Sequence, residues 1–282
     1  MLKLNAEDFD IVAKTVYEAT GIHLDQTKSY LIETRLSSLV KELGFTSYRQ
    51  LAELVRKQPG SNTMVRLIDA ITTNETFFFR DTQPFELLRQ KLLPDLYDRR
   101  TRYKRQTGMD PGPLKIWSAA CSTGQELYST AIILKEMLPM LGNPEVKLLG
   151  TDISRAALQQ ASAGRYNKFE VERGLSPELR NKYFVPDQGN WRIKDELRAM
   201  VSFQQINLLK PMTGIGRWDI IFCRNVAIYF PIEDRKTLFN GLADAVAPGG
   251  ALIIGSTEFL SGICDRFVPN NHLRTVYYTI NS

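Results

Sequence analysis

The chain has 282 residues, a hydrophobic content of 43%, a charged content of 24% and a net charge of +5, which are ordinary values for a globular protein of one or two domains. No apolar stretch is long enough to span a bilayer, and the first ten residues contain no signal-peptide core. Three cysteines without metal-like spacing fit a reducing compartment. From these features we expect a cytoplasmic protein without membrane insertion.

The first eighty residues have the pattern of a small helical bundle. Asn5 can cap a first helix, and Gly21 can end it. Apolar residues then recur at helical spacing, Thr46 can cap the next helix, and a further helix is predicted at about 62–71. We therefore interpret residues 1–75 as an N-terminal all-α domain.

Residues 76–113 are interpreted as a linker helix followed by a basic linker, which ends where Gly and Pro cluster at 107–113. Seven cations fall between residues 89 and 105, against only Asp95 and Asp98. They are Arg89, Lys91, Arg99, Arg100, Arg102, Lys104 and Arg105. Such a run indicates either a solvated helix face or a patch that meets an acidic partner.

From residue 114 onward, strand and helix patterns alternate. Strands are predicted at 114–120, 146–152, 201–206, 218–224, 250–256 and 273–280. The alternation predicts an α/β domain over residues 114–282, with a doubly wound, mostly parallel sheet covered on both faces. Short alternating runs around a turn predict a small antiparallel β excursion at about 183–206.

The most informative segment joins the first predicted strand to the first helix. It breaks at Ser122, Thr123 and Gly124, small residues that let the backbone approach a ligand closely. The second strand ends at Asp152, a carboxylate placed to accept hydrogen bonds from ribose hydroxyls. This order predicts a cofactor that contains a nucleoside. Taken alone, Asp152 could equally be a helix N-cap before Ser154.

Other constellations are missing from the sequence. No Gly-x-Gly-x-x-Gly follows a strand and no phosphate-loop lysine motif is present, which argues against a dinucleotide dehydrogenase. His23 and His272 are the only histidines, so we expect neither a metal site nor a histidine base. Cys121 and Cys223 end apolar strands and are interpreted as buried, inert thiols.

Five separated segments resemble those of the chemotaxis receptor methyltransferases, the CheR family. In chain order they are 74–80 (NETFFFR), 120–129 (ACSTGQELYS), 151–153 (TDI), 222–230 (FCRNVAIYF) and 247–260 (APGGALIIGSTEFL). The resemblance covers nearly the whole chain and implies a Rossmann-like class I methyltransferase domain preceded by an all-α domain. The cofactor turn departs from the family at Gln125 and Leu127, where Glu and Pro are common, but it keeps Glu126.

The resemblance implies S-adenosylmethionine as cofactor and S-adenosylhomocysteine as product. Asp152 would accept the ribose hydroxyls, and Glu126 would meet the cationic amino-acid end of the cofactor. The other implied cofactor-binding residues are Asn207 and Leu208 beside the adenine, Asn225 and Val226 on the far wall, and Asn74, Thr76 and Arg80 on the linker side.

The resemblance also implies the reaction, which is methylation of glutamate side chains on methyl-accepting chemotaxis receptors. A glutamate with a pKa near 4.3 is already ionised at neutral pH, so no base is needed. Arg80 is expected to hold that carboxylate, and Tyr229 to donate a hydrogen bond near the reacting centre. An ion pair between domains remains open for Arg80, as does a packing role for Tyr229.

The expected partner is the helical bundle of the receptor, contacted by the N-terminal domain of a monomeric enzyme. The short loop at 186–190, with Gly189 as its one glycine, predicts no dependence on the tether pentapeptide that some family members bind there. Two alternatives stay open. One is a nucleic-acid methyltransferase, suggested by a pI of about 9.0 but lacking the Asn/Asp-Pro-Pro-aromatic motif. The other is a non-catalytic module that only binds the cofactor.

Overall fold

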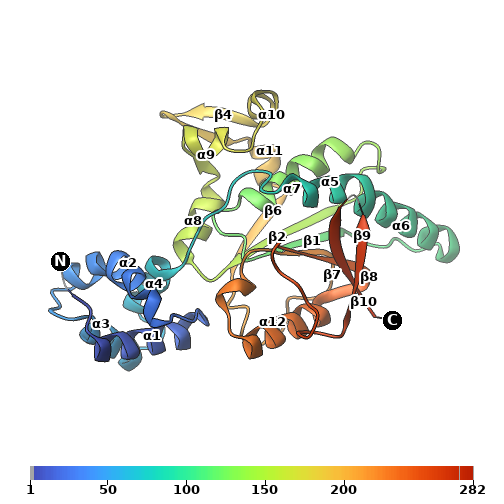
Figure 1. The fold of residues 1–282 in the computed structure, drawn as a ribbon. Coiled ribbons are helices and arrows are strands. Elements are labelled where there is room, and N and C mark those ends of the chain that lie inside the picture. Colours follow the sequence, from blue (N-terminus) through green and yellow to red (C-terminus); the bar gives the residue numbers. More distant parts are fainter. Residues whose placement is uncertain (1–2, 273, 282) are drawn as a thin grey trace.

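The computed structural model describes residues 3–272 and 274–281. It consists of an N-terminal helical bundle, a large α/β unit and a small antiparallel sheet (Figure 1). The bundle contains α1 (Ala6–Thr20), α2 (Ser29–Glu42), α3 (Tyr48–Lys57) and α4 (Asn62–Ile71), with a short 3-10 turn, η1 (Gln26–Lys28), before α2. The predicted all-α segment is therefore present as a bundle of four helices.

Capping residues decide where the helices of the bundle begin and end. The Asn5 side chain caps α1, and Gly21 ends it in the left-handed conformation at φ 78°, as predicted. The prediction that Thr46 caps α3 is wrong, because the side chain of Ser47 accepts the capping hydrogen bond. The apolar sides of the helices form one core, which includes Val16, Ile32, Leu36, Tyr48, Leu51 and Leu67.

The large sheet has seven strands in the order β6-β2-β1-β7-β8-β10-β9. Five are parallel: β1 (Leu114–Ala119), β2 (Val146–Asp152), β6 (Val201–Gln205), β7 (Trp218–Cys223) and β8 (Val246–Ile254). β10 (Thr275–Ile280) pairs antiparallel with β8, and β9 (Phe267–His272) pairs antiparallel with β10 at the sheet edge. This confirms the predicted Rossmann-like, doubly wound α/β class. Residue 273, where the last strand was expected to begin, lies outside the described residues.

Helices cover both faces of the large sheet (Figure 1). One face carries α5 (Thr82–Leu87), a π-helical turn η2 (Leu88–Leu92), α6 (Leu93–Thr107) and α7 (Gln125–Met137). Their buried apolar side chains, in α6 as far along the chain as Leu96, share a core with β1, so the helix within the expected linker at 76–113 packs on the sheet. The other face carries α12 (Ile232–Ala245). α8 (Arg155–Ala163) contacts β2 and β6.

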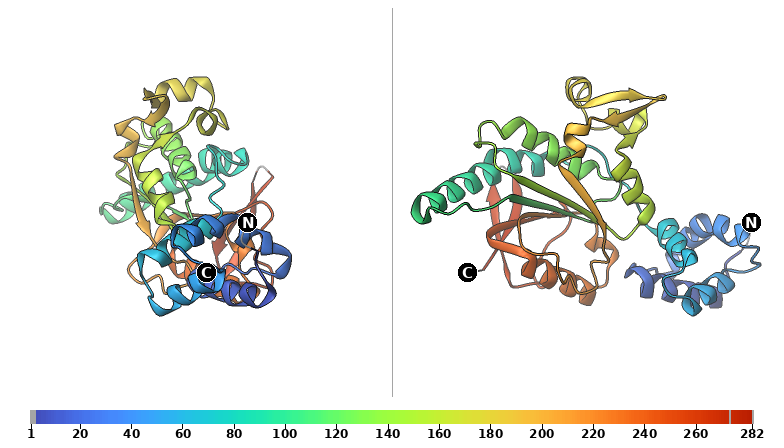
Figure 2. Two further views of the ribbon diagram at one scale, coloured as in Figure 1. Left: turned by 90° about the vertical axis from the view of Figure 1, so that its left-hand side faces the viewer. Right: turned by 180° about the vertical axis from the view of Figure 1, so that it is seen from behind.

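The small sheet has the strand order β3-β5-β4, from β3 (Arg165–Tyr166), β4 (Phe184–Asp187) and β5 (Asn190–Ile193). With it lie α9 (Lys168–Glu172), α10 (Pro177–Tyr183) and α11 (Asp195–Arg198). This corrects the expected excursion at 183–206, because the small sheet begins earlier and β6 belongs to the large sheet. Figure 2 shows the small sheet and the helical bundle at separate corners of the α/β unit. Within the described residues, no helix combines the length and apolarity needed to cross a bilayer.

Candidate active site

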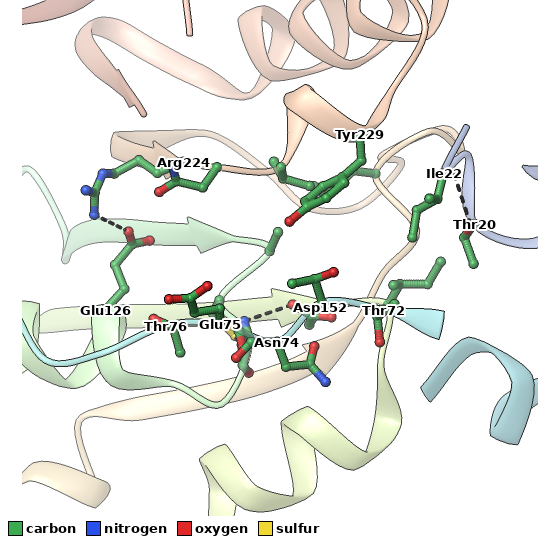
Figure 3. Close-up of a pocket in the computed structure, with 18 of the residues that line it drawn as sticks. Thr20, Ile22, Thr72, Asn74, Glu75, Thr76, Glu126, Asp152, Arg224 and Tyr229 are labelled. Atoms are coloured by element: carbon green, nitrogen blue, oxygen red, sulfur yellow. Dashed lines mark hydrogen bonds and ion pairs between the residues drawn. The ribbon is translucent and has the colours of Figure 1, made fainter. Parts of the chain in front are cut away.

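A pocket lies at the carboxyl ends of β1, β2, β6 and β7, where open α/β sheets bind their ligands. The N-terminal bundle contributes Thr20 and Ile22 to its wall, and the segment that follows α4 closes another side (Figure 3). The structure brings all ten residues predicted for the site to this pocket: Asn74, Thr76, Arg80, Glu126, Asp152, Asn207, Leu208, Asn225, Val226 and Tyr229.

The turn after β1 has an unusual backbone. Ala120, Ser122 and Gly124 have φ values of 63°, 52° and 94°, a region that non-glycine residues rarely adopt. A side chain at Gly124 would clash with α8, since its Cβ would lie 2.8 Å from that of Ala161. Strained backbone of this kind is concentrated at functional sites, where the surrounding structure holds it in place. Here it directs the Ser122 N–H toward the pocket wall formed by β2.

Asp152 ends β2 and is buried against this turn. Its Oδ2 accepts from Ser122 N–H at 2.8 Å and its Oδ1 accepts from Ser154 N–H at 2.9 Å. Burial raises the pKa of Asp152 above its ordinary value, and the backbone donors oppose that shift. The alternative of a helix cap at Asp152 is wrong, because the Ser154 side chain caps α8 by accepting from Ala157 N–H. The carboxylate keeps lone pairs for a ligand.

Glu126, in the first turn of α7, forms a buried ion pair with Arg224 that was not predicted from the sequence. Its Oε2 lies 2.9 Å from Nη1 of Arg224, and its Oε1 accepts from the hydroxyl of Ser118 at 2.7 Å. Arg224 also pairs with Asp81 at 2.8 Å, and its side chain is 2% exposed. Two carboxylates against one guanidinium leave a net charge of −1 beside the pocket. The signal was a charged residue directly after the apolar strand β7.

The two departures in the cofactor turn face away from the pocket. Gln125 is buried, and its Oε1 accepts from the hydroxyl of Thr123 at 2.8 Å, which ties the turn together. Leu127 is fully buried in the core between α7 and the sheet. Neither side chain lines the pocket, whose acidic lining residues are Glu75, Glu126 and Asp152.

Arg80 and Tyr229 also line the pocket. The guanidinium of Arg80 donates to the carbonyl of Glu75 at 2.8 Å, and among the described residues it forms no ion pair with a carboxylate. Tyr229 ends the 3-10 turn η3 (Ala227–Tyr229) and directs its hydroxyl into the pocket (Figure 3). The backbone N–H of His23 donates to its carbonyl at 3.0 Å, which joins the bundle to this turn. A domain-bridging ion pair for Arg80 is therefore not formed in the described part of the chain.

Three further predicted residues form hydrogen bonds within the protein. Asn74 accepts from the Ser122 hydroxyl at 3.0 Å through its carbonyl. Asn225 has a φ of 58°, and its N–H donates to Glu258 at 2.9 Å. Asn207 donates to the carbonyl of Ala19 at 3.4 Å, so its side chain also contacts the bundle.

The chemistry of the pocket fits a nucleoside that carries a cationic tail. Asp152 offers acceptors for hydroxyl groups, and Ile153, Ile206, Leu208 and Val226 offer apolar walls for a flat base. The net negative charge around Glu126 suits a cation. In the part of the chain that the structure describes, no three His, Cys, Asp or Glu side chains gather as a metal site.

A doubly wound sheet with a tight turn after its first strand and a carboxylate after its second defines a Rossmann-like, nucleoside-binding domain. Comparison with known families agrees with this class. Residues 74–274 match the CheR methyltransferase SAM binding domain, and residues 7–72 match the CheR methyltransferase all-alpha domain. The chain belongs to the CheR methyltransferase family, and its cofactor is S-adenosylmethionine.

Similar proteins match nearly the whole chain. The chemotaxis protein methyltransferase Cher2 of Pseudomonas putida is 36% identical over 265 residues, covering 92% of this chain and 93% of that protein. Chemotaxis protein methyltransferase 1 of Pseudomonas aeruginosa is 37% identical over 264 residues, again covering 92% and 93%. Chemotaxis protein methyltransferase 1 of Vibrio cholerae is 38% identical over 250 residues, covering 88% and 87%.

Proposed function

We propose that this chain transfers the methyl group of S-adenosylmethionine to glutamate side chains of methyl-accepting chemotaxis receptors. The observation that carries the proposal is that Arg80 lines the pocket and, among the described residues, forms no ion pair with a carboxylate. The names of the similar proteins, which are chemotaxis protein methyltransferases, support the same class of substrate.

The residues that would hold the cofactor occupy two ends of the pocket. Asp152 would accept hydrogen bonds from the ribose hydroxyls, and Glu126 would neutralise the amino-acid end. The remaining walls are assigned to Asn207 and Leu208 beside the adenine, Asn225 and Val226 opposite, and Asn74, Thr76 and Arg80 toward the substrate. When bound, the cofactor supplies an electrophilic methyl group on a sulfonium.

The substrate side of the pocket needs to orient an anion rather than remove a proton. A glutamate with a pKa near 4.3 is ionised at neutral pH, so the transfer needs no general base. Arg80 would pair with the carboxylate and keep it from being desolvated without a partner. Tyr229 would donate a hydrogen bond near the reacting oxygen. Such positioning can supply about 7–11 kcal/mol of a barrier at most.

The partner surface is assigned to the N-terminal bundle of a cytoplasmic, monomeric enzyme. Charge gives this assignment limited support, because Arg49 pairs with Glu7 and Asp8, and Arg56 pairs with Glu18. Arg35 donates to the carbonyl of Ile71. Lys41 and Lys57 form no ion pair within the described residues, so both are available to meet an acidic receptor helix.

The test is methyl transfer from radiolabelled S-adenosylmethionine to the cytoplasmic fragment of a chemotaxis receptor. We expect label that base releases as methanol, since a glutamyl methyl ester is base-labile, and no label when the receptor glutamates are replaced by alanine. Cofactor binding without transfer in a single-turnover experiment would favour the non-catalytic module. Transfer to DNA with a steep salt dependence would favour the nucleic-acid enzyme.

A further inference from the structure

The turn that joins α9 to α10, at residues 173–174, lies directly against the segment that carries Arg80. Gly174 has a φ of 100°, and a Cβ built on it would lie 1.9 Å from the carbonyl oxygen of Phe78. Because that neighbour is backbone, it cannot swing aside as a flexible side chain can. Only glycine allows this approach. The small sheet and its helices α9, α10 and α11, together called the small-sheet unit, are therefore in backbone contact with the 77–80 segment.

Arg173, the other residue of this turn, contacts Phe77 and Glu75, and both of these residues also contact Arg80. Its guanidinium carbon lies 4.2 Å from the ring centroid of Phe77, and its Nη2 lies 3.1 Å from Oε1 of Glu75. Arg80 lies 5.8 Å from the same ring centroid and donates to the carbonyl of Glu75. Phe77 and Glu75 are therefore shared between the two arginines, and the position of one constrains the other.

The 77–81 segment depends on its surroundings for its conformation. Phe79 and Asp81 have φ values of 52° and 53°, which non-glycine residues adopt only when neighbouring structure holds them. Phe78 is fully buried, with its ring 5.1 Å from Tyr166 and 5.4 Å from Phe184 of the small sheet. The small-sheet unit thus contacts this segment through aromatic rings, through the backbone of Gly174 and through the side chain of Arg173.

We propose that the 173–174 turn is a positioning element of the active site, in which Arg173 orients Arg80 through Phe77 and Glu75. The inference rests on the proposed function for the identity of the anion that Arg80 meets. Arg173 itself touches no described part of the pocket other than Glu75, so it acts through Arg80 and not on the substrate. The small-sheet unit thereby takes part in methyl transfer by fixing one catalytic side chain.

Kinetics of Arg173→Ala test this role against a matched control in the same unit. We expect kcat/KM for the receptor fragment to fall about tenfold or more, while affinity for S-adenosylhomocysteine changes less than about threefold. Arg173→Lys keeps a cation for Phe77 and Glu75 and should restore most of the loss. The control is Arg180→Ala, because Arg180 stacks 4.7 Å from the Trp191 ring centroid without contacting Phe77, and it should stay near wild type. Equal losses in both arginine variants, or none in Arg173→Ala, would overturn the proposal.

Hydrogen exchange gives a readout that needs no substrate. The Phe79 N–H donates to the Ser129 hydroxyl at 2.9 Å and the Arg80 N–H to the Phe77 carbonyl at 3.3 Å, so both amides report on the segment. Their exchange should accelerate in Arg173→Ala and stay unchanged in Arg180→Ala. If wild type failed to methylate receptors, the proposed function would fail while this comparison still decided the positioning role. Unchanged exchange in Arg173→Ala would overturn that role.

Two glycine-to-alanine variants distinguish the effect of losing the Gly174–Phe78 contact from the effect of backbone strain alone. Gly189 has a φ of 79° and no atom within 4 Å of its would-be Cβ, so Gly189→Ala matches Gly174→Ala in strain but not in contact. Gly174→Ala should accelerate exchange of the Phe79 and Arg80 amides and lower methyl transfer, and Gly189→Ala should do neither. If the two alanine variants behaved alike, the backbone contact at Gly174 would have no positioning role. Should Gly174→Ala fail to fold, the Arg173 comparisons decide the question alone.

Discussion

At the scale of single residues, Asp152 is the side chain proposed to bind the ribose of the cofactor. Asp152→Ala should weaken binding of S-adenosylhomocysteine at least about tenfold, because charge-assisted hydrogen bonds contribute about 1.5–3 kcal/mol each. Calorimetry on the purified protein measures this directly. Asp98→Ala is a suitable control, since Asp98 is exposed on α6 and far from the pocket lining. An unchanged affinity in Asp152→Ala would remove this carboxylate from the binding site.

The raised pKa of Asp152 gives the binding a pH dependence. The ionised carboxylate accepts ribose hydroxyls, so affinity should be complete above the pKa of Asp152 and fall as the pH drops through it. Because burial raises that pKa, the loss should begin at a higher pH than the ordinary aspartate value of 3.8 suggests. The same shift means that ionisation of Asp152 costs folding stability at neutral pH. Calorimetry across acidic pH should show the dependence in wild type and a flat profile in Asp152→Asn.

Substitution of Arg80 should affect methyl transfer much more than cofactor affinity. Arg80→Ala should lower turnover about a hundredfold, since it removes a preorganised partner of the reacting carboxylate, and should lower affinity for S-adenosylhomocysteine much less. Turnover and affinity are measured on one preparation, with Arg102→Ala on exposed α6 as the control. Equal losses in both quantities would reassign Arg80 to cofactor binding, and no loss in either would make it a structural residue.

At the scale of elements, the β4–β5 hairpin bears on the tether peptide. Its two loop residues, Gln188 and Gly189, have φ values of 51° and 79°, as in a tight type I′ turn. Trp191 is half-buried and covered by Arg180, so it acts as a packing residue. A turn this short leaves little loop backbone for a second chain to pair with. An acidic pentapeptide with an aromatic end should therefore show no low-micromolar binding by calorimetry, with a tether-dependent relative as the positive control.

The strands and helices with clear periodicity could be predicted from the sequence, and those with mixed signals could not. The apolar runs of β1, β2 and β7 were placed to within one residue, because buried parallel strands are nearly continuous in hydrophobicity. β9 was missed because Pro269, Asn270 and Asn271 are typical of turns, yet an edge strand tolerates them.

Pocket residues that belong to a recognisable motif could be predicted from the sequence. Ion pairs and contacts that depend on the tertiary structure could not. The sequence located Asp152 and Glu126 at strand and helix ends. It did not reveal that Arg224 would be buried between Glu126 and Asp81, because ion pairing over 98 and 143 residues has no local pattern. The contact of Gly174 with Phe78 escaped for the same reason, although a glycine between two short helices was visible.

At the scale of the whole molecule, the helical bundle forms part of the cofactor pocket. Tyr17 donates to Asp234 of α12 at 2.8 Å, and His23 donates through its backbone to the carbonyl of Tyr229. Asp69, on α4, accepts from the Ser154 hydroxyl at 2.8 Å and from Ala156 N–H at 3.1 Å. A carboxylate of the bundle thus binds the N-terminus of α8, two residues beyond Asp152, where a negative charge is favourable.

This arrangement predicts that cofactor binding and docking of the bundle stabilise each other. Asp69→Ala should weaken S-adenosylhomocysteine binding by about three- to tenfold, because the N-terminal end of α8 and the bundle wall lose a shared anchor worth about 1 kcal/mol. Hydrogen exchange should show that the ligand protects residues 20–23 and 72–76 in wild type and protects them less in Asp69→Ala. Asp10→Ala, an exposed acid on α1, serves as the control. If the ligand protected neither segment in wild type, or if Asp69→Ala bound as tightly as wild type, the two units would act independently and the bundle would be only a wall of the pocket.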